Sequence, residues 1–151
     1  MTRHEAREAL LCMLFDYSFN AEEKPDELLE LYLENYYDKK EKCVCEELRQ
    51  NNYFTQTYFG VIANIPEIDA YIDKCAEKWS TKRISRVSLS ILRIAIYEIL
   101  YVNDVPENVA INEAVELAKR FDNDDSYAFV NGVLGGVTKM IAEGKKPEAD
   151  E

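Results

Sequence analysis

The amino-acid sequence predicts an all-α protein, and two observations carry this prediction. The 151 residues include only five glycines and four prolines, and stretches with apolar residues at helical spacing dominate the chain. One stretch, at 84–102, is apolar on almost every side of a helix, so other elements must pack around it. We therefore expect about seven helices in two bundles. An N-terminal helical subdomain at 1–80 and a C-terminal one at 81–151, built around the central helix 84–102, together form one compact domain.

The first predicted helix spans 3–19 and starts with a basic cluster. Its apolar residues fall on one face: Ala6, Leu10, Met13 and Leu14. Thr2 and Glu5 have the spacing of a capping box, which satisfies two backbone N–H groups at the helix start. Arg3 and Arg7 lie in the first two turns, where cations oppose the helix dipole. This placement favours an anionic ligand, and surface charge that is merely tolerated is the alternative.

Three more helices are predicted before residue 80. The first begins at Pro25, the second spans 42–63 and the third spans 66–78. Proline suits the first turn of a helix, because the N–H it lacks would have no partner there. Four aromatic residues gather in the helix at 42–63: Tyr53, Phe54, Tyr58 and Phe59. Such rings can stack on unpaired bases, but their helical spacing favours a place in the core.

A narrow polar stripe remains on the central helix, where Arg86, Ser90, Arg93 and Tyr97 line up at helical spacing. This pattern predicts an edge that is open to solvent or to a ligand, although a structural role suits Arg93 equally well. The apolar length also approaches the roughly 20 residues that cross a bilayer. However, Arg93 and Glu98 interrupt the stretch, and ionisable groups at mid-membrane are costly. A buried helix is therefore the better interpretation.

The last two predicted helices cover 107–121 and a segment that ends near 142, with Asp124 or Asp125 as the cap of the second. Each glycine in a helix lowers its stability by about 1 kcal/mol, so the glycines here indicate close packing: Gly132, Gly135 and Gly136. Near the helix start, Ser126, Phe129 and Asn131 combine a hydroxyl, a ring and an amide. Phe129 and Asn131 can stack on and hydrogen-bond an unpaired base, although a core position also suits Phe129.

The charge of the chain argues against non-specific binding of nucleic acid. The net charge is −11, yet the segment 78–97 holds five basic residues and no acidic one. The basic residues are Lys78, Lys82, Arg83, Arg86 and Arg93. A local basic patch on an acidic protein suits a limited contact with an anion, and a solvated charged face is the alternative.

No motif for catalysis, a cofactor or a metal is present in the sequence. The only histidine, His4, lies near the N-terminus, and Cys43 and Cys45 have no second pair with which to form a zinc site. The N-terminus also lacks the apolar core of a signal peptide, so we expect reduced cysteines in the cytosol. The sequence therefore predicts a cytoplasmic binding protein that is not an enzyme.

Several segments in combination resemble the NusB family of transcription antitermination proteins. The similarity is dense between residues 79 and 134 and covers little more than the first helix before that. It rests on Ala6-Arg-Glu-Ala-Leu, Ile91-Leu-Arg-Ile-Ala-Ile-Tyr-Glu-Ile-Leu, Asp104-Val-Pro, Val109-Ala-Ile-Asn-Glu-Ala-Val-Glu-Leu-Ala-Lys-Arg-Phe, Asp125-Ser and Phe129-Val-Asn-Gly-Val-Leu. The resemblance implies two crosswise-packed helical bundles. It also implies binding of boxA-like single-stranded leader RNA together with NusE, a small-subunit ribosomal protein. That complex joins RNA polymerase and other Nus factors and promotes transcription of ribosomal RNA operons.

The resemblance also assigns roles to particular residues. Arg3 and Arg7 match the arginine-rich first helix of the family, and Phe129 and Asn131 match a segment that lies near the RNA. We add Ser126 and Arg86 to the predicted RNA-binding residues. Asp125 matches a position near NusE, and we place Glu113 and Tyr97 on the same partner-binding side.

The chain departs from the family pattern at four positions. Relatives often carry three consecutive basic residues where this chain has Arg3, His4 and Glu5, and often a basic residue where it has Ala128. Cys12 replaces a common glutamine of the first helix. Each lost phosphate contact lowers RNA affinity, so we expect the protein partner to supply much of the binding. The alternative is a protein-only helical adaptor of the same fold with little RNA affinity.

Overall fold

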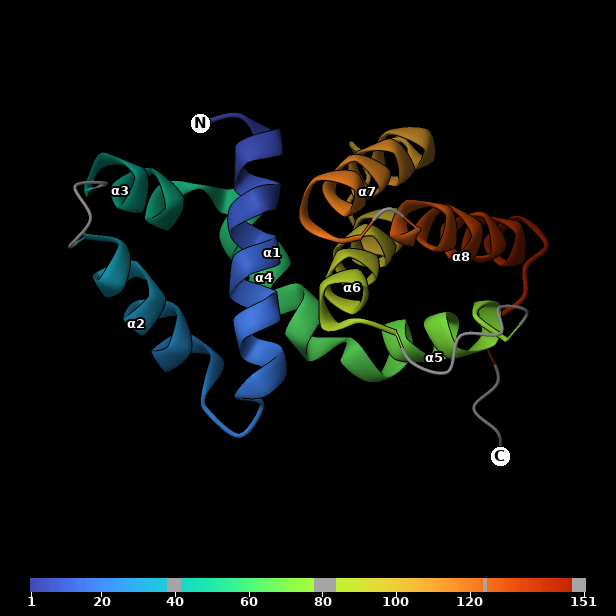
Figure 1. The fold of residues 1–151 in the computed structure, drawn as a ribbon, viewed down its shortest axis with the longest axis horizontal. Coiled ribbons are helices and arrows are strands. Elements are labelled where there is room, and N and C mark those ends of the chain that lie inside the picture. Colours follow the sequence, from blue (N-terminus) through green and yellow to red (C-terminus); the bar gives the residue numbers. More distant parts are fainter. Residues whose placement is uncertain (38–41, 78–83, 124, 148–151) are drawn as a thin grey trace. The chain divides into compact units, whose positions relative to one another are not determined.

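Every regular element of the described residues is a helix, which confirms the predicted all-α class (Figure 1). The computed structural model describes residues 1–37, 42–77, 84–123 and 125–147, without the side chains of 35–37 and 42–45. Its eight helices are α1 (Arg3–Phe19), α2 (Pro25–Tyr37), α3 (Lys42–Gln50), α4 (Asn52–Ala63), α5 (Ile65–Cys75), α6 (Arg86–Tyr101), α7 (Glu107–Phe121) and α8 (Ser126–Ala142).

Contacts divide the chain into two compact units, Met1–Ala63 and Asn64–Glu151. The first holds α1 to α4 and the second holds α5 to α8. The sequence suggested a division near residue 80, which would leave α5 with the N-terminal helices. Instead α5 packs on α6 and α8, and this packing places it in the second unit.

The core of the first unit lies between α1 and α4, which pack side by side (Figure 1). The four predicted apolar residues of α1 are all buried, as expected: Ala6, Leu10, Met13 and Leu14. From α4, Phe54 and Tyr58 are fully buried, which confirms their predicted place in the core. Tyr53 and Phe59 are not buried, so the core prediction is wrong for these two rings.

The predicted helix at 42–63 is two helices, because the chain breaks at Asn51. The side-chain oxygen of Asn51 accepts a hydrogen bond from the backbone N–H of Phe54, at 2.8 Å. This bond caps the start of α4 and uses an N–H that has no partner within the helix. The described part of the chain therefore holds eight helices where about seven were predicted.

The second unit is built around α6, which contacts α5, α7 and α8 (Figure 1). Ile91, Leu92 and Ile96 are fully buried, as the apolar circumference of this helix predicted. The helix starts two residues later than the predicted 84, because Ser85 caps it through the backbone N–H of Ser88. No helix within the described ranges is long and apolar enough to cross a membrane.

The polar stripe of the central helix is not the open edge that the sequence predicted. Ser90 is fully buried, and the guanidinium of Arg93 pairs with Asp69 of α5. Farther along α6, the hydroxyl of Tyr101 donates a hydrogen bond to Glu67, also of α5. Residues three and four apart on a helix form one line, and α5 contacts this line at Arg93 and Tyr101, while Arg86 at its start remains exposed.

Candidate nucleic-acid interface

The start of α1 brings two of the predicted RNA-binding residues together over an aromatic ring. The guanidinium carbon of Arg3 lies 4.5 Å from the ring centre of Tyr53, and that of Arg7 lies 5.5 Å from it. Arg3 and Arg7 are four residues apart, so α1 presents both on one side, and α4 supplies the ring. Cations at these distances are attracted by the electrons of the ring face. Tyr53 thus helps to hold two positive charges at a helix start.

The two arginines differ in how far a ligand can reach them. Arg3 is exposed, whereas the exposed fraction of Arg7 is only 4%. A phosphate can therefore contact Arg3 directly. Arg7 lies over the ring of Tyr53 and adds positive charge from below the surface. The sequence could not distinguish the two, because both lie in the first two turns of α1 and four residues apart.

The same helix start carries its predicted cap. The hydroxyl of Thr2 accepts from the backbone N–H of Glu5 at 3.0 Å, and the carboxylate of Glu5 accepts from the backbone N–H of Thr2 at 2.9 Å. This confirms the capping box. His4 pairs with Glu8, one turn farther along α1, at 3.2 Å. The carboxylates of Glu5 and Glu8 therefore limit the positive potential around the two arginines.

In the second unit, Asp122 ties the end of α7 to the start of α6. One oxygen of its carboxylate accepts from the hydroxyls of Ser85 and Ser88, both at 2.7 Å, and the other accepts from the backbone N–H of Asn123 at 2.9 Å. Burial would raise the pKa of Asp122, but the hydrogen bonds from Ser88, Ser85 and Asn123 outweigh it and lower the pKa. The network therefore links the end of α7 to the start of α6.

The side chain of Asn123, rather than that of Asp125, holds the start of α8. The side-chain oxygen of Asn123 accepts from the backbone N–H of Asp125 and from the hydroxyl of Ser126, both at 3.0 Å. The side chain of Asp125 makes no capping hydrogen bond, so that prediction is wrong for this residue. Asp124 lies outside the described residues. Because its side chain makes no cap, the carboxylate of Asp125 is exposed to a partner.

The three predicted RNA-binding residues of α8 differ in exposure. Asn131 is exposed. Ser126 is 8% exposed, and its hydroxyl already donates to Asn123. Phe129 is 9% exposed and packs mainly in the core of the unit. Of these three, Asn131 is therefore the residue most accessible to a base, while Phe129 offers little surface.

Two exposed aromatic rings near the start of α8 each lie beside a cationic side chain, a feature that the sequence did not predict. Nζ of Lys119 lies 5.1 Å from the ring centre of Tyr127, and the guanidinium carbon of Arg120 lies 5.2 Å from that of Phe121. Both rings are 42% exposed. Tyr127 is also four residues before Asn131, so the two share a face of α8. Exposed rings beside cations are typical of surfaces that bind single-stranded nucleic acid. Lys-Arg-Phe at a helix end is the sequence signal for this feature.

The other predicted binding residues of the second unit lie on α6 and α7. Arg86 is exposed at the start of α6. Among the predicted partner-binding residues, Tyr97 and Glu113 are half-buried, on α6 and α7. Tyr97 packs against Tyr101, with ring centres 5.3 Å apart. Lys78, Lys82 and Arg83 of the predicted basic patch lie outside the described residues.

Within the described ranges, no three side chains of histidine, cysteine, aspartate or glutamate are grouped so that they could hold a metal ion. The side chains of Cys43 and Cys45, for which the sequence disfavoured a zinc site, lie outside those ranges. What the structure offers is a set of cationic and aromatic groups in each unit, with an exposed amide added in the second. Arg3, Arg7 and Tyr53 belong to the first unit, and Lys119, Tyr127 and Asn131 belong to the second.

Known proteins of one family match nearly the whole chain. The family model described as NusB family matches residues 4–139. The transcription antitermination protein NusB of Natranaerobius thermophilus is 41% identical over 143 residues, which cover 93% of this chain and 97% of that protein. The structure of T. maritima NusB has 35% identity and a TM-score of 0.70, and covers 97% of this chain and 94% of that one. A structure of antitermination factors NusB and NusE in complex with dsRNA has 24% identity and a TM-score of 0.70, and covers 92% of this chain and 98% of that one. At that identity, the last likeness establishes the fold alone.

Proposed function

The chain belongs to the NusB family, and we propose that it is an RNA-binding transcription antitermination factor. In this proposal it binds boxA-like single-stranded leader RNA together with NusE and promotes processive transcription of ribosomal RNA operons. RNA polymerase and the other Nus factors are the wider assembly that the complex joins. Because transcription takes place there, the proposal locates the protein in the cytoplasm.

The observation that carries the RNA part of the proposal is the pair of arginines over Tyr53. A protein with a net charge of −11 repels polyanions overall, so any RNA contact must be confined to local basic sites. Arg3 and Arg7 form such a site, held by a ring that can also stack on a base. We assign phosphate binding to Arg3, base recognition to Asn131, and lesser contacts to Arg86, Ser126 and Phe129.

The protein partner is supported by the charge of the second unit. A structural relative is described as NusB with NusE and dsRNA, and a ribosomal protein that binds RNA is expected to be basic. The exposed carboxylate of Asp125 and the half-buried Glu113 offer acidic contacts to such a protein. We therefore propose that Asp125, Glu113 and Tyr97 lie on the partner-binding side.

A titration of boxA-like RNA, with and without NusE, tests the proposal. Fluorescence anisotropy should show that the protein with NusE binds this RNA more tightly than a scrambled RNA of equal composition. Affinity should fall as salt rises, with a slope of roughly 0.7 for each phosphate contact in a single strand. Equal binding of both RNAs in the presence of NusE would refute the antitermination function.

A protein-only adaptor with little RNA affinity is the second candidate. It is favoured by the burial of Arg7 and Phe129, which leaves fewer groups for RNA than the sequence suggested. The same titration separates the two, because an adaptor would bind NusE without any preference for the boxA-like RNA. Neither candidate involves catalysis, and we propose that the protein is not an enzyme.

A further inference from the structure

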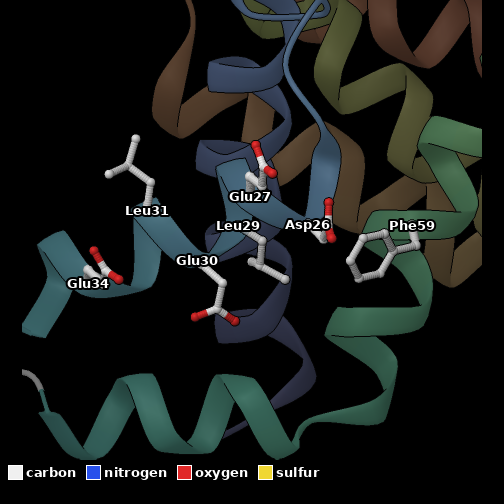
Figure 2. A pocket seen from close by; sticks show the side chains of 7 residues that line it. All are labelled: Asp26, Glu27, Leu29, Glu30, Leu31, Glu34 and Phe59. Atoms are coloured by element: carbon white, nitrogen blue, oxygen red, sulfur yellow. The ribbon is translucent and has the colours of Figure 1, made fainter.

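A groove on the first unit combines apolar side chains with carboxylates, and the proposed function does not use it. It is a pocket of about 510 Å³ between α2 and α4, lined by Asp26, Glu27, Leu29, Glu30, Leu31, Glu34 and Phe59. Figure 2 shows that Leu29 of α2 and Phe59 of α4 point toward the same space, with the carboxylates of Asp26 and Glu30 beside them. We call these seven residues the acidic groove.

Exposed apolar side chains are what distinguish this groove from an ordinary solvated helix face. Leu31 is 54% exposed and Phe59 is 39% exposed. Covering such side chains yields roughly 25 cal/mol for each Å² of apolar surface removed from water. Exposed apolar surface that is rimmed by polar groups is typical of a site where another protein binds.

The rim of the groove determines which kind of partner fits. Four of its seven residues are acidic, and among them Glu30 pairs with Arg49 of α3 at 2.9 Å. The excess of carboxylates repels RNA and other polyanions. A metal ion is not favoured either, since no suitable group of three ligands exists among the described residues. A partner that carries both apolar and positively charged side chains matches this groove, because the first kind packs on its apolar residues and the second pairs with its carboxylates.

The acidic groove and the arginine pair use different sides of α4. Tyr53, which supports Arg3 and Arg7, and Phe59 are six positions apart, which corresponds to about 240° around a helix. The first unit can therefore contact RNA through one side of α4 and a basic partner through another. The arginine pair suits an anionic ligand and the acidic groove suits a cationic one, so neither ligand competes for the site of the other.

We propose that the acidic groove binds an amphipathic helix of a partner protein, with leucine-like side chains against Leu29 and Phe59, with Leu31 at the outer edge of the groove on the other side of α2, and with lysines or arginines against the carboxylates. The binding mode is a helix laid in a groove, anchored at positions spaced three and four residues apart. α2 has 13 residues, so its length of roughly 20 Å accommodates three to four turns of such a helix. Complementary charge would determine specificity and the rate of association, and the apolar contacts would hold the complex.

The probe for this site is a synthetic helical peptide of about 14 residues, with leucines on one face and lysines elsewhere. Fluorescence anisotropy measures its affinity for the full-length chain. Two control peptides are a scrambled version that has no apolar face and a version with glutamates in place of the lysines. We expect the first peptide to bind at least tenfold more tightly than either control. Backbone NMR shifts should locate it at residues 26–34 and 59.

Variants of the groove separate specific docking from general attraction to an acidic protein. The pair Glu27→Lys and Glu34→Lys should weaken the peptide about tenfold, because two favourable charge contacts become repulsive. The matched control, Asp73→Lys with Glu77→Lys, changes the net charge equally at exposed positions of the second unit and should leave affinity within about twofold. Equal weakening by both pairs would overturn the proposal.

The apolar contribution has its own matched variants. Leu31→Ser and Phe59→Ser should each weaken the peptide several-fold, whereas Phe19→Ser removes a ring that is 58% exposed outside the groove and should not. Circular dichroism verifies that each variant is folded. Leu31→Ser should disturb the fold less than Phe59→Ser, because the side chain of Leu31 is the more exposed. Unchanged affinity in Leu31→Ser and Phe59→Ser would refute the proposal. Sedimentation provides a second test. If the unmodified chain self-associates and Leu31→Ser abolishes this, a second copy of the chain occupies the groove and the proposal is refuted.

Discussion

Arg93 and Asp69 form a two-point ion pair that links α6 to α5. Nε of Arg93 donates to one carboxylate oxygen of Asp69 at 3.0 Å, and an outer nitrogen donates to the other at 2.8 Å. The side chains are 12% and 33% exposed. Planar guanidinium and carboxylate groups that meet in this way fix both the distance and the orientation of the elements that carry them. Arg93 therefore has the structural role that the sequence left as an alternative.

The substitution Arg93→Met tests this role. It leaves the carboxylate of Asp69 without its partner, so we expect the free energy of unfolding to fall by about 2 kcal/mol. Urea unfolding of Arg93→Met, Asp69→Asn and the double variant measures the coupling between the two residues. The salt slope of RNA binding should not change, because Arg93 contacts α5. A reduced slope at unchanged stability would instead make Arg93 a phosphate ligand.

The two arginines of α1 should respond differently to removal. Arg3→Ala removes an exposed cation, so RNA affinity should fall and the salt slope should decrease by roughly 0.7. Arg7→Ala should weaken RNA binding as well, but it should also lower the free energy of unfolding by about 1 kcal/mol, since the buried side chain packs on Tyr53. Paired RNA titrations over a salt series and urea unfolding measure both effects. An unchanged slope in either variant would remove that arginine from the RNA site.

Substitutions of Phe129 and Asn131 should likewise differ in their effects on stability and on RNA binding. Phe129→Ala should lower the free energy of unfolding by about 3 kcal/mol, because the ring is nearly buried. Asn131→Ala changes an exposed residue and should alter stability by less than about 0.5 kcal/mol while it weakens RNA binding. Urea unfolding and anisotropy distinguish the two outcomes. If Asn131→Ala binds RNA as the unmodified chain does, the amide takes no part in recognition.

Local sequence signals predicted the helices where caps and prolines mark their ends. The capping box of Thr2 and Glu5 marked the start of α1, and α7 and α8 also end where the sequence placed them. The break at Asn51 was missed because Asn51 lies in a polar run, where an asparagine cap looks like any other surface residue. Helical spacing continues on both sides of it.

The candidate site was less predictable than the fold, because its geometry depends on residues far apart in the chain. Arg93 looked accessible since its partner, Asp69, lies 24 residues earlier and on another helix. Arg7 looked as exposed as Arg3, and only the fold reveals that Arg7 is buried while Arg3 stays exposed. Spacing shows which side of a helix a residue occupies, but not which element covers that side.

The hydrogen-bonded carboxylate of Asp122 should make stability depend on pH. Because its pKa is lower in the folded protein than the ordinary 3.8, its contribution is fully present above that value and is lost as pH falls through the folded-state pKa. We expect Asp122→Asn to lower the free energy of unfolding by about 1 kcal/mol at neutral pH, and less below a pH of about 4. Urea unfolding over a pH series measures this, with Asp125→Asn as an exposed control. A loss that is equal at all pH values would show that the charge of Asp122 is not responsible.

Gly135 and Gly136 are adjacent in α8, yet they should respond differently to alanine. An added methyl group at Gly135 meets no atom within 4 Å, whereas one at Gly136 would lie 3.1 Å from Sγ of Cys75 on α5. Alanine stabilises an unhindered helical position by about 1 kcal/mol, so Gly135→Ala should raise the free energy of unfolding by that amount. Gly136→Ala forces α5 and α8 apart locally, and we expect it to lose that gain. Urea unfolding compares the two, and adding Cys75→Ala to Gly136→Ala should restore part of the difference because it removes the sulfur. Equal stabilisation by Gly135→Ala and Gly136→Ala would show that the approach of Cys75 imposes no constraint on α8.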